Sequence, residues 1–261
     1  VSKELTAKFL TDGQCNPDAR AAIRLIFHDC GAKNGCDGSL ILAGELARGE
    51  NKGLQPIADY VQGMAQRLDT SVADMIVFAG THAIVTCPGG PQVKTFVGRK
   101  DSTTPAPDGL LPDVNPPAAD LFKLFRDKGF NEVDLAALLG AHSTSNQFNF
   151  NTSADAVGKP QDSTPGVWDV KYYSDTLKPP QGVVVLPSDT KLAVHQQVGK
   201  EFSGFVNNQG KWNGKFAYAM GKKALFGSGG TNGLVDCTGA LPRATNAKRE
   251  MRGMPLFAPR H

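Results

Sequence analysis

Two short apolar stretches, each centred on a histidine, constrain this chain more than any other feature. Residues 24–30 read Arg-Leu-Ile-Phe-His-Asp-Cys, and residues 138–143 read Leu-Leu-Gly-Ala-His-Ser. Arg24 and His28 are four residues apart, so both side chains lie on one face of a helix. A cation and an imidazole are costly to bury on an apolar helix without a partner or a purpose. Such a pair can move a proton and stabilise developing negative charge, while His142 could bind a metal from the opposite side.

The composition is that of a globular protein without an obvious nucleic-acid or membrane partner. The chain has 261 residues, enough for one large domain or two small lobes, and 40% of them are hydrophobic. The net charge of +3 is weak, and Lys and Arg form no basic stripe of the kind that binds nucleic acids. No apolar run approaches the ~20 residues of a membrane span. The chain opens without a signal peptide, which fits a cytosolic protein or a mature secreted one.

Five cysteines limit the possible metal and disulfide chemistry. No two of them form a Cys-x-x-Cys pair, so a zinc site is not expected. Cys30 and Cys36 could close a short loop, and Cys15 and Cys87 could close a long one. Cys237 would then be left over.

Helical periodicity covers much of the chain, and sustained strands are nearly absent. We expect helices at residues 18–30, 54–68, 71–85, 117–127, 131–143, 188–208 and 214–225. The best strand candidate is Val183-Val184-Val185. Residues 145–187 form a Gly-, Pro-, Asp- and Ser-rich span with little periodicity, and a bound ion would explain so long an irregular stretch. This span includes the glycosylation sequon Asn151-Thr152-Ser153, which, together with the cysteines, favours secretion.

Five sequence blocks occur in the order that is typical of one known family. They are Arg-x-x-Phe-His-Asp-Cys at 24–30, Gly-Cys-Asp-Gly-Ser at 35–39, Leu-Gly-Ala-His-Ser at 139–143, Asp-Ser-Thr-Pro-Gly at 162–166 and Phe-Val-Asn-Asn-Gln at 205–209. Together they resemble the plant, fungal and bacterial haem peroxidases, and most closely the secreted fungal class II enzymes.

The resemblance implies a single, mainly α-helical domain with two lobes around one haem b. The distal lobe would span about residues 1–130 and the proximal lobe about 131–237, followed by an irregular tail at 238–261.

On the proximal side, the resemblance makes His142 the axial iron ligand. Asp189, in Leu-Pro-Ser-Asp at 186–189, would accept a hydrogen bond from the other ring nitrogen and give the imidazole anionic character. Read alone, Asp189 is a good helix N-cap. Phe27 would lie over the haem, and Pro112 would line the entrance to its edge.

On the distal side, the resemblance makes His28 the group that moves the proton of the bound peroxide. Arg24 would stabilise the departing hydroxide. Asn51 would hold the tautomer of His28, and Glu45 would steady Asn51.

Two oxygen-rich clusters resemble the calcium sites of the family, although ordinary polar loops contain similar groups. The distal cluster comprises Asp29, Gly35, Asp37 and Ser39. The proximal cluster comprises Ser143, Asp162, Thr164, the carbonyl of Val167, and Asp169. Because Ser143 adjoins the axial histidine, a proximal ion would tether the irregular span to the proximal helix.

The family's disulfides can also be mapped onto this chain. Cys15 with Cys87 resembles a class II bridge, whereas Cys30 with Cys36 resembles the short bridge of plant secreted peroxidases. The usual partner of Cys237 is missing.

The chain departs from its specialised relatives at four positions. Manganese-oxidising enzymes carry three acids where this chain has Pro17, Ala21 and Phe148, and lignin-attacking enzymes carry a surface Trp where it has Ala137. We therefore expect neither a manganese site nor oxidation through that residue. Other aromatic residues are either surface relays or ordinary packing: Trp168, Trp212, Tyr60, Tyr172, Tyr173 and Tyr218. Gln161 replaces a proximal aromatic, and two further histidines, His82 and His195, are expected to be structural or exposed.

The expected protein is therefore a secreted, monomeric peroxidase with haem b and two Ca²⁺ ions and a role in the response to oxidative stress. It would use hydrogen peroxide to oxidise small phenolic or aromatic donors by one-electron steps through an oxo-iron(IV) intermediate. One alternative is a haem- and calcium-binding surface protein with little turnover, against which Arg24, His28 and Asn51 argue. Another is a lignin-type peroxidase that uses a different surface aromatic.

Overall fold

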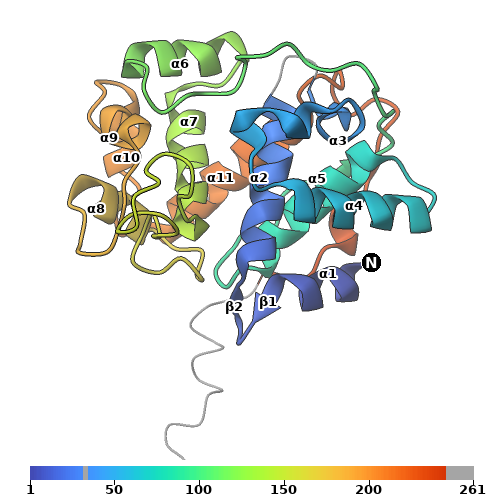
Figure 1. Ribbon diagram of the computed structural model, residues 1–261, viewed down its shortest axis with the longest axis horizontal. Coiled ribbons are helices and arrows are strands. Elements are labelled where there is room, and N and C mark those ends of the chain that lie inside the picture. The colour runs from blue at the N-terminus through green and yellow to red at the C-terminus, as the bar shows by residue number, and fades with distance from the viewer. Residues whose placement is uncertain (32–34, 245–261) are drawn as a thin grey trace, which may run out of the picture.

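The computed structural model describes residues 1–31 and 35–244, and this part of the chain is mainly helical (Figure 1). Its α-helices are α1 Ser2–Phe9, α2 Pro17–Gly31, α3 Ser39–Leu42, α4 Gln55–Arg67, α5 Val72–Thr86, α6 Ala118–Asp127, α7 Glu132–Leu139, α8 Lys171–Leu177, α9 Pro187–Ala193, α10 Val198–Ser203 and α11 Gln209–Ala224. Short 3₁₀ segments are η1 Glu45–Ala47, η2 Gly49–Asn51, η3 Gly140–Thr144 and η4 Thr238–Ala240.

The first half of the chain is built on the packing of α2 against α5. The Oδ1 atom of Asn16 accepts the amide of Ala19 and starts α2, while the Ser71 side chain caps α5. Every residue of α5 is buried. Gly80 lets the two helices approach closely, because a Cβ atom at this position would lie 2.4 Å from Cγ2 of Ile26. This contact fixes the height and tilt of α2 in the core.

The second half is built around α7. A capping box between Asn131 and Asp134 starts this helix, which continues directly into η3. Helices α10 and α11 pack against α7, and α11 also contacts α2. Nε1 of Trp212 donates a hydrogen bond to the carbonyl of Ala137 over 3.0 Å. In Figure 1, α11 passes between α7 and α2 and so joins the two halves.

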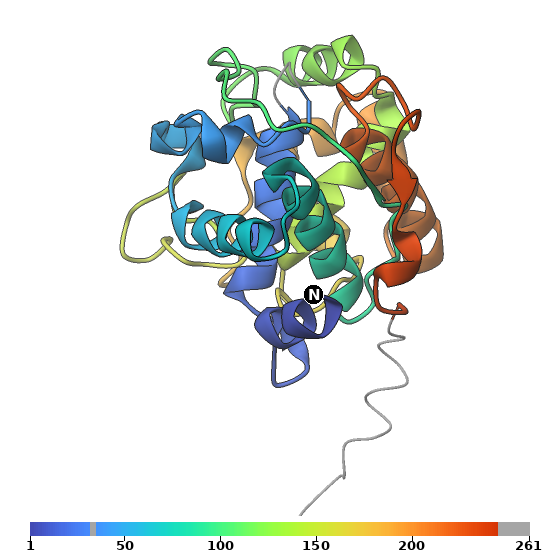
Figure 2. The same cartoon turned by 90° about the vertical axis from the view of Figure 1, so that its right-hand side faces the viewer.

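The strands have two residues each and form two short antiparallel pairs. Strand β1 (Leu10–Thr11) pairs antiparallel with β2 (Gln14–Cys15), and β3 (Phe96–Val97) pairs with β4 (Val235–Asp236). Through the second pair, the chain after α11 lies along one side of the molecule (Figure 2). No single helix among the described residues has the length and apolar character to cross a membrane, and only the bent pair of α4 and α5 meets that test jointly.

Several sequence expectations need correction. The predicted helix at 188–208 is two helices, α9 and α10, and the helix expected at 214–225 begins at Gln209. Val183-Val184-Val185 forms no strand: Val183 donates its amide to the nearby carbonyl of Pro180, Val184 donates to Pro160, and no ladder continues from these two bonds. Helices α1, α3 and α8 were not predicted.

The division into two lobes at about residue 130 stays a prediction. Helix α6 precedes this boundary in the chain but packs on α7 and α9, which follow it. The expected irregular tail contains η4, and its residues 245–261 lie outside the described residues.

Candidate active site

Arg24 and His28 lie one turn apart on α2, and hydrogen bonds join both to the segment around η2. Nε of Arg24 donates to Nε2 of His28 over 3.2 Å. The two terminal nitrogens of Arg24 donate to the carbonyls of Lys52 and Glu50, over 2.9 and 2.6 Å. The guanidinium is therefore held in place on three sides, with its charge beside the imidazole.

Asn51 determines which ring nitrogen of His28 carries the proton. Nδ2 of Asn51 donates to the carbonyl of Glu45 over 2.8 Å, so Oδ1 is the atom that faces His28. Oδ1 lies 2.6 Å from Nδ1 of His28 and can only accept a hydrogen bond. The proton consequently resides on Nδ1, and Nε2 keeps its lone pair, which accepts the long hydrogen bond from Nε of Arg24 and could exchange it for a proton of a substrate.

The same surroundings keep His28 neutral. Burial lowers the pKa of its imidazole to about 3, and the positive charge of Arg24 adds to this effect. The hydrogen bond to Asn51 opposes the shift, and the more distant charge of Lys223 reinforces it. A neutral imidazole with an accepting Nε2 is the form that a general base requires.

Glu45 contacts Asn51 through its backbone, and its side chain has separate partners. Its backbone carbonyl, not its carboxylate, accepts the hydrogen bond from Asn51. The buried carboxylate instead accepts from the amide of Ala106 over 2.8 Å and from Arg48 over 3.0 Å. The side chain thus anchors the loop that carries Asn51.

The second predicted histidine, His142, lies in η3 and is hydrogen-bonded to Asp189 at the start of α9. Nδ1 of His142 is 2.7 Å from Oδ2 of Asp189. Burial alone would lower the pKa of His142, but the charge and the hydrogen bond of Asp189 outweigh it and raise this pKa. Asp189 also accepts from Tyr172 at Oδ2 over 2.9 Å and from Ser188 at Oδ1 over 3.1 Å. The carboxylate therefore has three donors, and one of them fixes the orientation of the imidazole ring.

Phe27 and Pro112 are the two further residues predicted around the haem. The half-buried ring of Phe27 lies between Phe125, with ring centroids 6.5 Å apart, and the amine of Lys223, which is 4.0 Å from the ring centroid. Its centroid is 5.9 Å from that of His28. Pro112 is half-buried in the loop between β3 and α6.

The chemistry of these residues fits a haem. With Nδ1 of His142 bonded to Asp189, Nε2 is the nitrogen left for iron, and within the described residues it has no hydrogen-bond partner. Gln161, predicted to replace a proximal aromatic, is buried with its Oε1 atom unpaired among the described residues.

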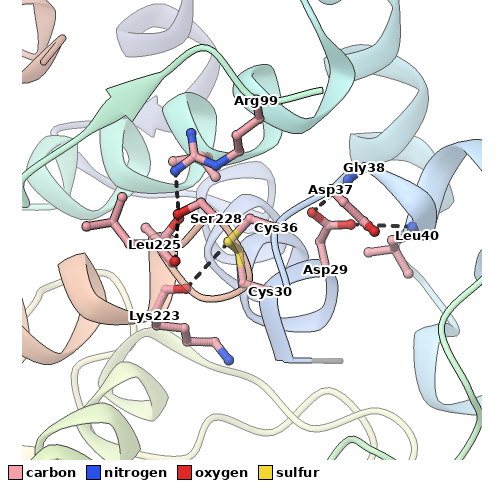
Figure 3. The surroundings of a disulfide bond; sticks show 12 residues. Asp29, Cys30, Cys36, Asp37, Gly38, Leu40, Arg99, Lys223, Leu225 and Ser228 are labelled. Atoms are coloured by element: carbon pink, nitrogen blue, oxygen red, sulfur yellow. Dashed lines mark hydrogen bonds between the residues drawn. A yellow bond between two sulfur atoms is a disulfide. The ribbon is translucent and has the colours of Figure 1, made fainter. Parts of the chain in front are cut away.

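The distal oxygen cluster begins with Asp29 in the last turn of α2 and continues in the segment before α3 (Figure 3). The two carboxylate oxygens of Asp29 accept the amides of Gly38 and Leu40, and Asp37 lies beside them. Burial raises the pKa of Asp29 to about 7, and the charge of Asp37 adds to this rise. Gly35 has φ +87° and lies against the carbonyl of Phe226, which leaves no room for a side chain. Ser39 is buried at the start of α3.

The proximal cluster contains two polar atoms that lack partners. Oγ of Ser143 and Oδ2 of Asp162 are buried, and neither forms a hydrogen bond within the described residues. Thr164 donates to Asp169 over 2.9 Å, and its amide donates to Oδ1 of Asp162 over 2.8 Å. Oxygen atoms of this kind, short of donors, are ligands that calcium prefers. Val167 lies between Thr164 and Asp169 in this loop, and its amide donates to the Thr164 carbonyl.

Comparison with known proteins decides the family. A family model described as "Peroxidase" matches residues 1–208. The chain belongs to the peroxidase family. Similar curated proteins include a low-redox potential peroxidase of Taiwanofungus camphoratus, 33% identical over 93% of this chain and 76% of that protein. Ligninase C of Trametes versicolor is 31% identical over 93% of this chain and 73% of its own length. Ligninase LG5 of Phanerodontia chrysosporium is 29% identical over 99% and 77%.

These relatives identify the chain as a class II haem peroxidase, an oxidoreductase that uses hydrogen peroxide. The mainly α-helical fold expected from the sequence is confirmed. Both predicted disulfides of this peroxidase, Cys15–Cys87 and Cys30–Cys36, are also confirmed. Cys237 forms no disulfide within the described part of the chain.

Several proposed surface relays of this peroxidase are not at the surface. Trp168 and Trp212 are fully buried and stacked on each other, with ring centroids 5.0 Å apart. Tyr172 and Tyr173 are also fully buried, whereas Tyr218 is 67% exposed. A relay that begins at either tryptophan is therefore wrong for this fold.

The two unassigned histidines have structural surroundings. His82 is buried between the hydroxyls of Ser2 and Thr86, at 3.1 and 3.0 Å. His195 is half-buried, with its ring edge-on to Phe122.

Sequence reasoning missed two residues close to the side chains predicted around the haem. Tyr172 was regarded only as a relay or as packing, yet its hydroxyl lies on Asp189. Lys223 was not singled out, although its buried amine lies over Phe27, and burial lowers the pKa of this amine to about 7. Neither residue belongs to a recognisable motif, because both reach the site through tertiary packing.

Proposed function

We propose that this chain is a secreted peroxidase that oxidises small phenolic or aromatic donors by one-electron steps at the haem edge. The observation that carries the proposal is the Arg24–His28–Asn51 network. It combines a neutral imidazole of defined tautomer with a fixed cation, and a protein that only stored haem would need neither.

His142 and Asp189 would hold the haem iron from the proximal side. When bound, haem supplies an iron centre that binds hydrogen peroxide and retains its two oxidising equivalents. Asp189 keeps the ring of His142 in one orientation and draws its Nδ1 proton, which makes Nε2 a stronger electron donor.

The distal residues would carry out the proton transfer. Nε2 of His28 accepts the proton from the inner oxygen of hydrogen peroxide and returns it to the outer oxygen, which leaves as water. Arg24 stabilises the negative charge that develops on the outer oxygen, and the carbonyls of Lys52 and Glu50 keep the guanidinium from turning away. The depressed pKa of His28 keeps the base ready in neutral and acidic solution.

We propose small aromatic donors because this chain lacks both the manganese-binding acids and the surface Trp of its specialised relatives. Pro17, Ala21 and Phe148 cannot ligate manganese. Ala137 is fully buried, so no surface oxidation can start there. Some relatives are named ligninases and one a low-redox potential peroxidase. Because Ala137 stands where lignin-attacking enzymes carry their surface Trp, and Trp168 is buried, we favour donors that react at the haem edge.

We further propose two bound Ca²⁺ ions, a monomeric enzyme and secretion. The unpartnered oxygens of Ser143 and Asp162 support the proximal ion. For the distal ion, Asp37 and Asp29 supply negative charge, although backbone amides already contact both Asp29 oxygens. Two disulfides support an oxidising compartment.

Stopped-flow mixing of the haem-loaded protein with hydrogen peroxide tests the proposal. We expect a fast change in the Soret band, and a loss of rate of about 10²-fold or more in His28→Leu. Steady-state turnover should then be measured with a phenol, a non-phenolic aromatic ether and Mn(II) side by side, with the phenol oxidised fastest. An unchanged Soret band would instead identify a haem-binding protein with little turnover, and preference for the ether or Mn(II) would refute the donor class.

A further inference from the structure

Tyr172 shares the carboxylate that orients the axial histidine. Its hydroxyl donates to Oδ2 of Asp189 over 2.9 Å, and this is the same oxygen that lies 2.7 Å from Nδ1 of His142. The ring of Tyr172 also meets that of His142 edge-on, with centroids 5.9 Å apart and an interplanar angle of 84°. One oxygen atom, Oδ2 of Asp189, therefore accepts hydrogen bonds from both the imidazole N–H of His142 and the phenol O–H of Tyr172.

From this geometry we infer that Tyr172 is a positioning residue that weakens the pull of Asp189 on His142 and so raises the reduction potential of the haem iron. The inference rests on the proposed role of His142 as the iron ligand. It adds a residue whose hydroxyl regulates that ligand without touching the iron.

The physical basis is competition for electron density on Oδ2. A carboxylate that accepts a phenol hydrogen bond carries less charge for its other donor, so the Nδ1–H bond of His142 is polarised less. An imidazole with less anionic character stabilises ferric iron less, and the ferric/ferrous potential rises. Ser188 withdraws charge from the same carboxylate, but at Oδ1 and over 3.1 Å, so its effect should be smaller.

The surroundings of Tyr172 keep it in this role. The side chain is fully buried, and its ring lies edge-on to Tyr173 and Phe202, with centroids 5.2 and 5.6 Å away. A phenol is protonated at neutral pH, and Oδ2 of Asp189 can only accept, so the hydroxyl of Tyr172 is the donor. The packing leaves the hydroxyl directed at Asp189.

The neighbouring tyrosine provides a matched control. Tyr173 is equally buried on the same helix, but its hydroxyl donates to the carbonyl of Ala136 over 3.0 Å and not to Asp189. Tyr172→Phe and Tyr173→Phe each remove one buried hydroxyl and keep the ring. Both should lower stability by a similar amount, and only the first should change the iron.

The experiment uses haem-loaded wild type and both variants. Mediated redox titration should give a lower ferric/ferrous potential for Tyr172→Phe, and resonance Raman of the ferrous form should give a higher iron–histidine stretching frequency. Ser188→Ala should shift both in the same direction by less, and it provides the test if Tyr172→Phe fails to fold. Tyr173→Phe should match the wild type.

Unchanged values in Tyr172→Phe, or equal shifts in both tyrosine variants, would overturn the inference and leave Tyr172 as packing. A wild-type ferrous spectrum without an iron–histidine band would overturn the proposed axial ligation itself, and with it this inference. The two failures are therefore distinguishable.

Discussion

Asn51 and Glu45 should contribute very differently to the reaction with hydrogen peroxide, although both were predicted as members of one relay. Asn51 contacts His28 through its side chain, whereas Glu45 reaches Asn51 only through its backbone carbonyl. Asn51→Leu removes the acceptor for Nδ1–H. Glu45→Gln keeps the backbone carbonyl and leaves an oxygen for the amide of Ala106.

The size of each effect follows from which bonds remain. In Asn51→Leu, the bond from Nε of Arg24 still favours a lone pair on Nε2 of His28, so the base is not lost entirely. The missing hydrogen bond is worth about 1 kcal/mol and the buried Nδ1–H is left unsatisfied, which together correspond to a rate about 10 to 100 times lower. Glu45→Gln should change the rate by no more than about twofold, because no bond to Asn51 is altered.

The assay is the second-order rate constant for the reaction with hydrogen peroxide, measured by stopped flow at pH 7 on proteins with matched haem content. A thermal melt of each variant separates a change in rate from loss of folded protein. If Glu45→Gln lost as much rate as Asn51→Leu, the carboxylate would matter directly, and the backbone route described above would be wrong.

Three further outcomes follow. The second-order rate constant for the reaction with hydrogen peroxide should stay level as the solution is acidified. It should fall only near the His28 pKa of about 3, because below this pH the base is protonated. A fall centred near pH 6 would contradict the burial of an uncharged His28. Burial lowers the pKa of His82 from its ordinary 6.5 to about 4, so the free energy of unfolding should fall by about 3 kcal/mol as the pH falls from 6.5 through 4. Urea unfolding at a series of pH values should show a smaller fall for His82→Gln than for the wild type. Equal falls in both proteins would refute the shift. Chelation of calcium should lower the melting temperature of the wild type. Asp162→Asn should reduce that response by the share of the proximal ion, while Asp120→Asn, at an exposed site on α6, should leave it unchanged.

Much of the helical framework could be predicted from periodicity, because its strongest signals come from long helices that bury one face or more. The range 71–85 differs from α5 by one residue at each end, and the side chain of Ser71 caps the helix. The failures have local causes. A Cβ at Gly199 would lie 2.5 Å from the carbonyl of Ala193, which shows how tightly the chain turns between α9 and α10. Periodicity alone could not locate this turn. Helix α1 is short and mixes charges with apolar residues, so its signal is weak.

The active site was predictable where a motif specifies side chains and unpredictable where the backbone acts. Arg24, His28 and Asn51 come together as the motif implies, but no sequence pattern could indicate that Glu45 acts through its carbonyl. Tyr172 likewise reaches Asp189 only because α8 packs beside α9. Tertiary packing therefore supplies the contacts that motifs omit.

The missing side chain at Gly80 has a consequence for attempts to redesign this enzyme. Because α5 touches α2 through the bare backbone of Gly80, even one added methyl group would push Ile26 and displace the helix that carries His28. Directed evolution toward new donors should therefore accumulate changes in the loop around Pro112 and few at the contact between Gly80 and Ile26. Library members that carry a side chain at position 80 should lose activity, although Gly80 lies on α5 and contacts none of Arg24, His28 and Asn51 directly.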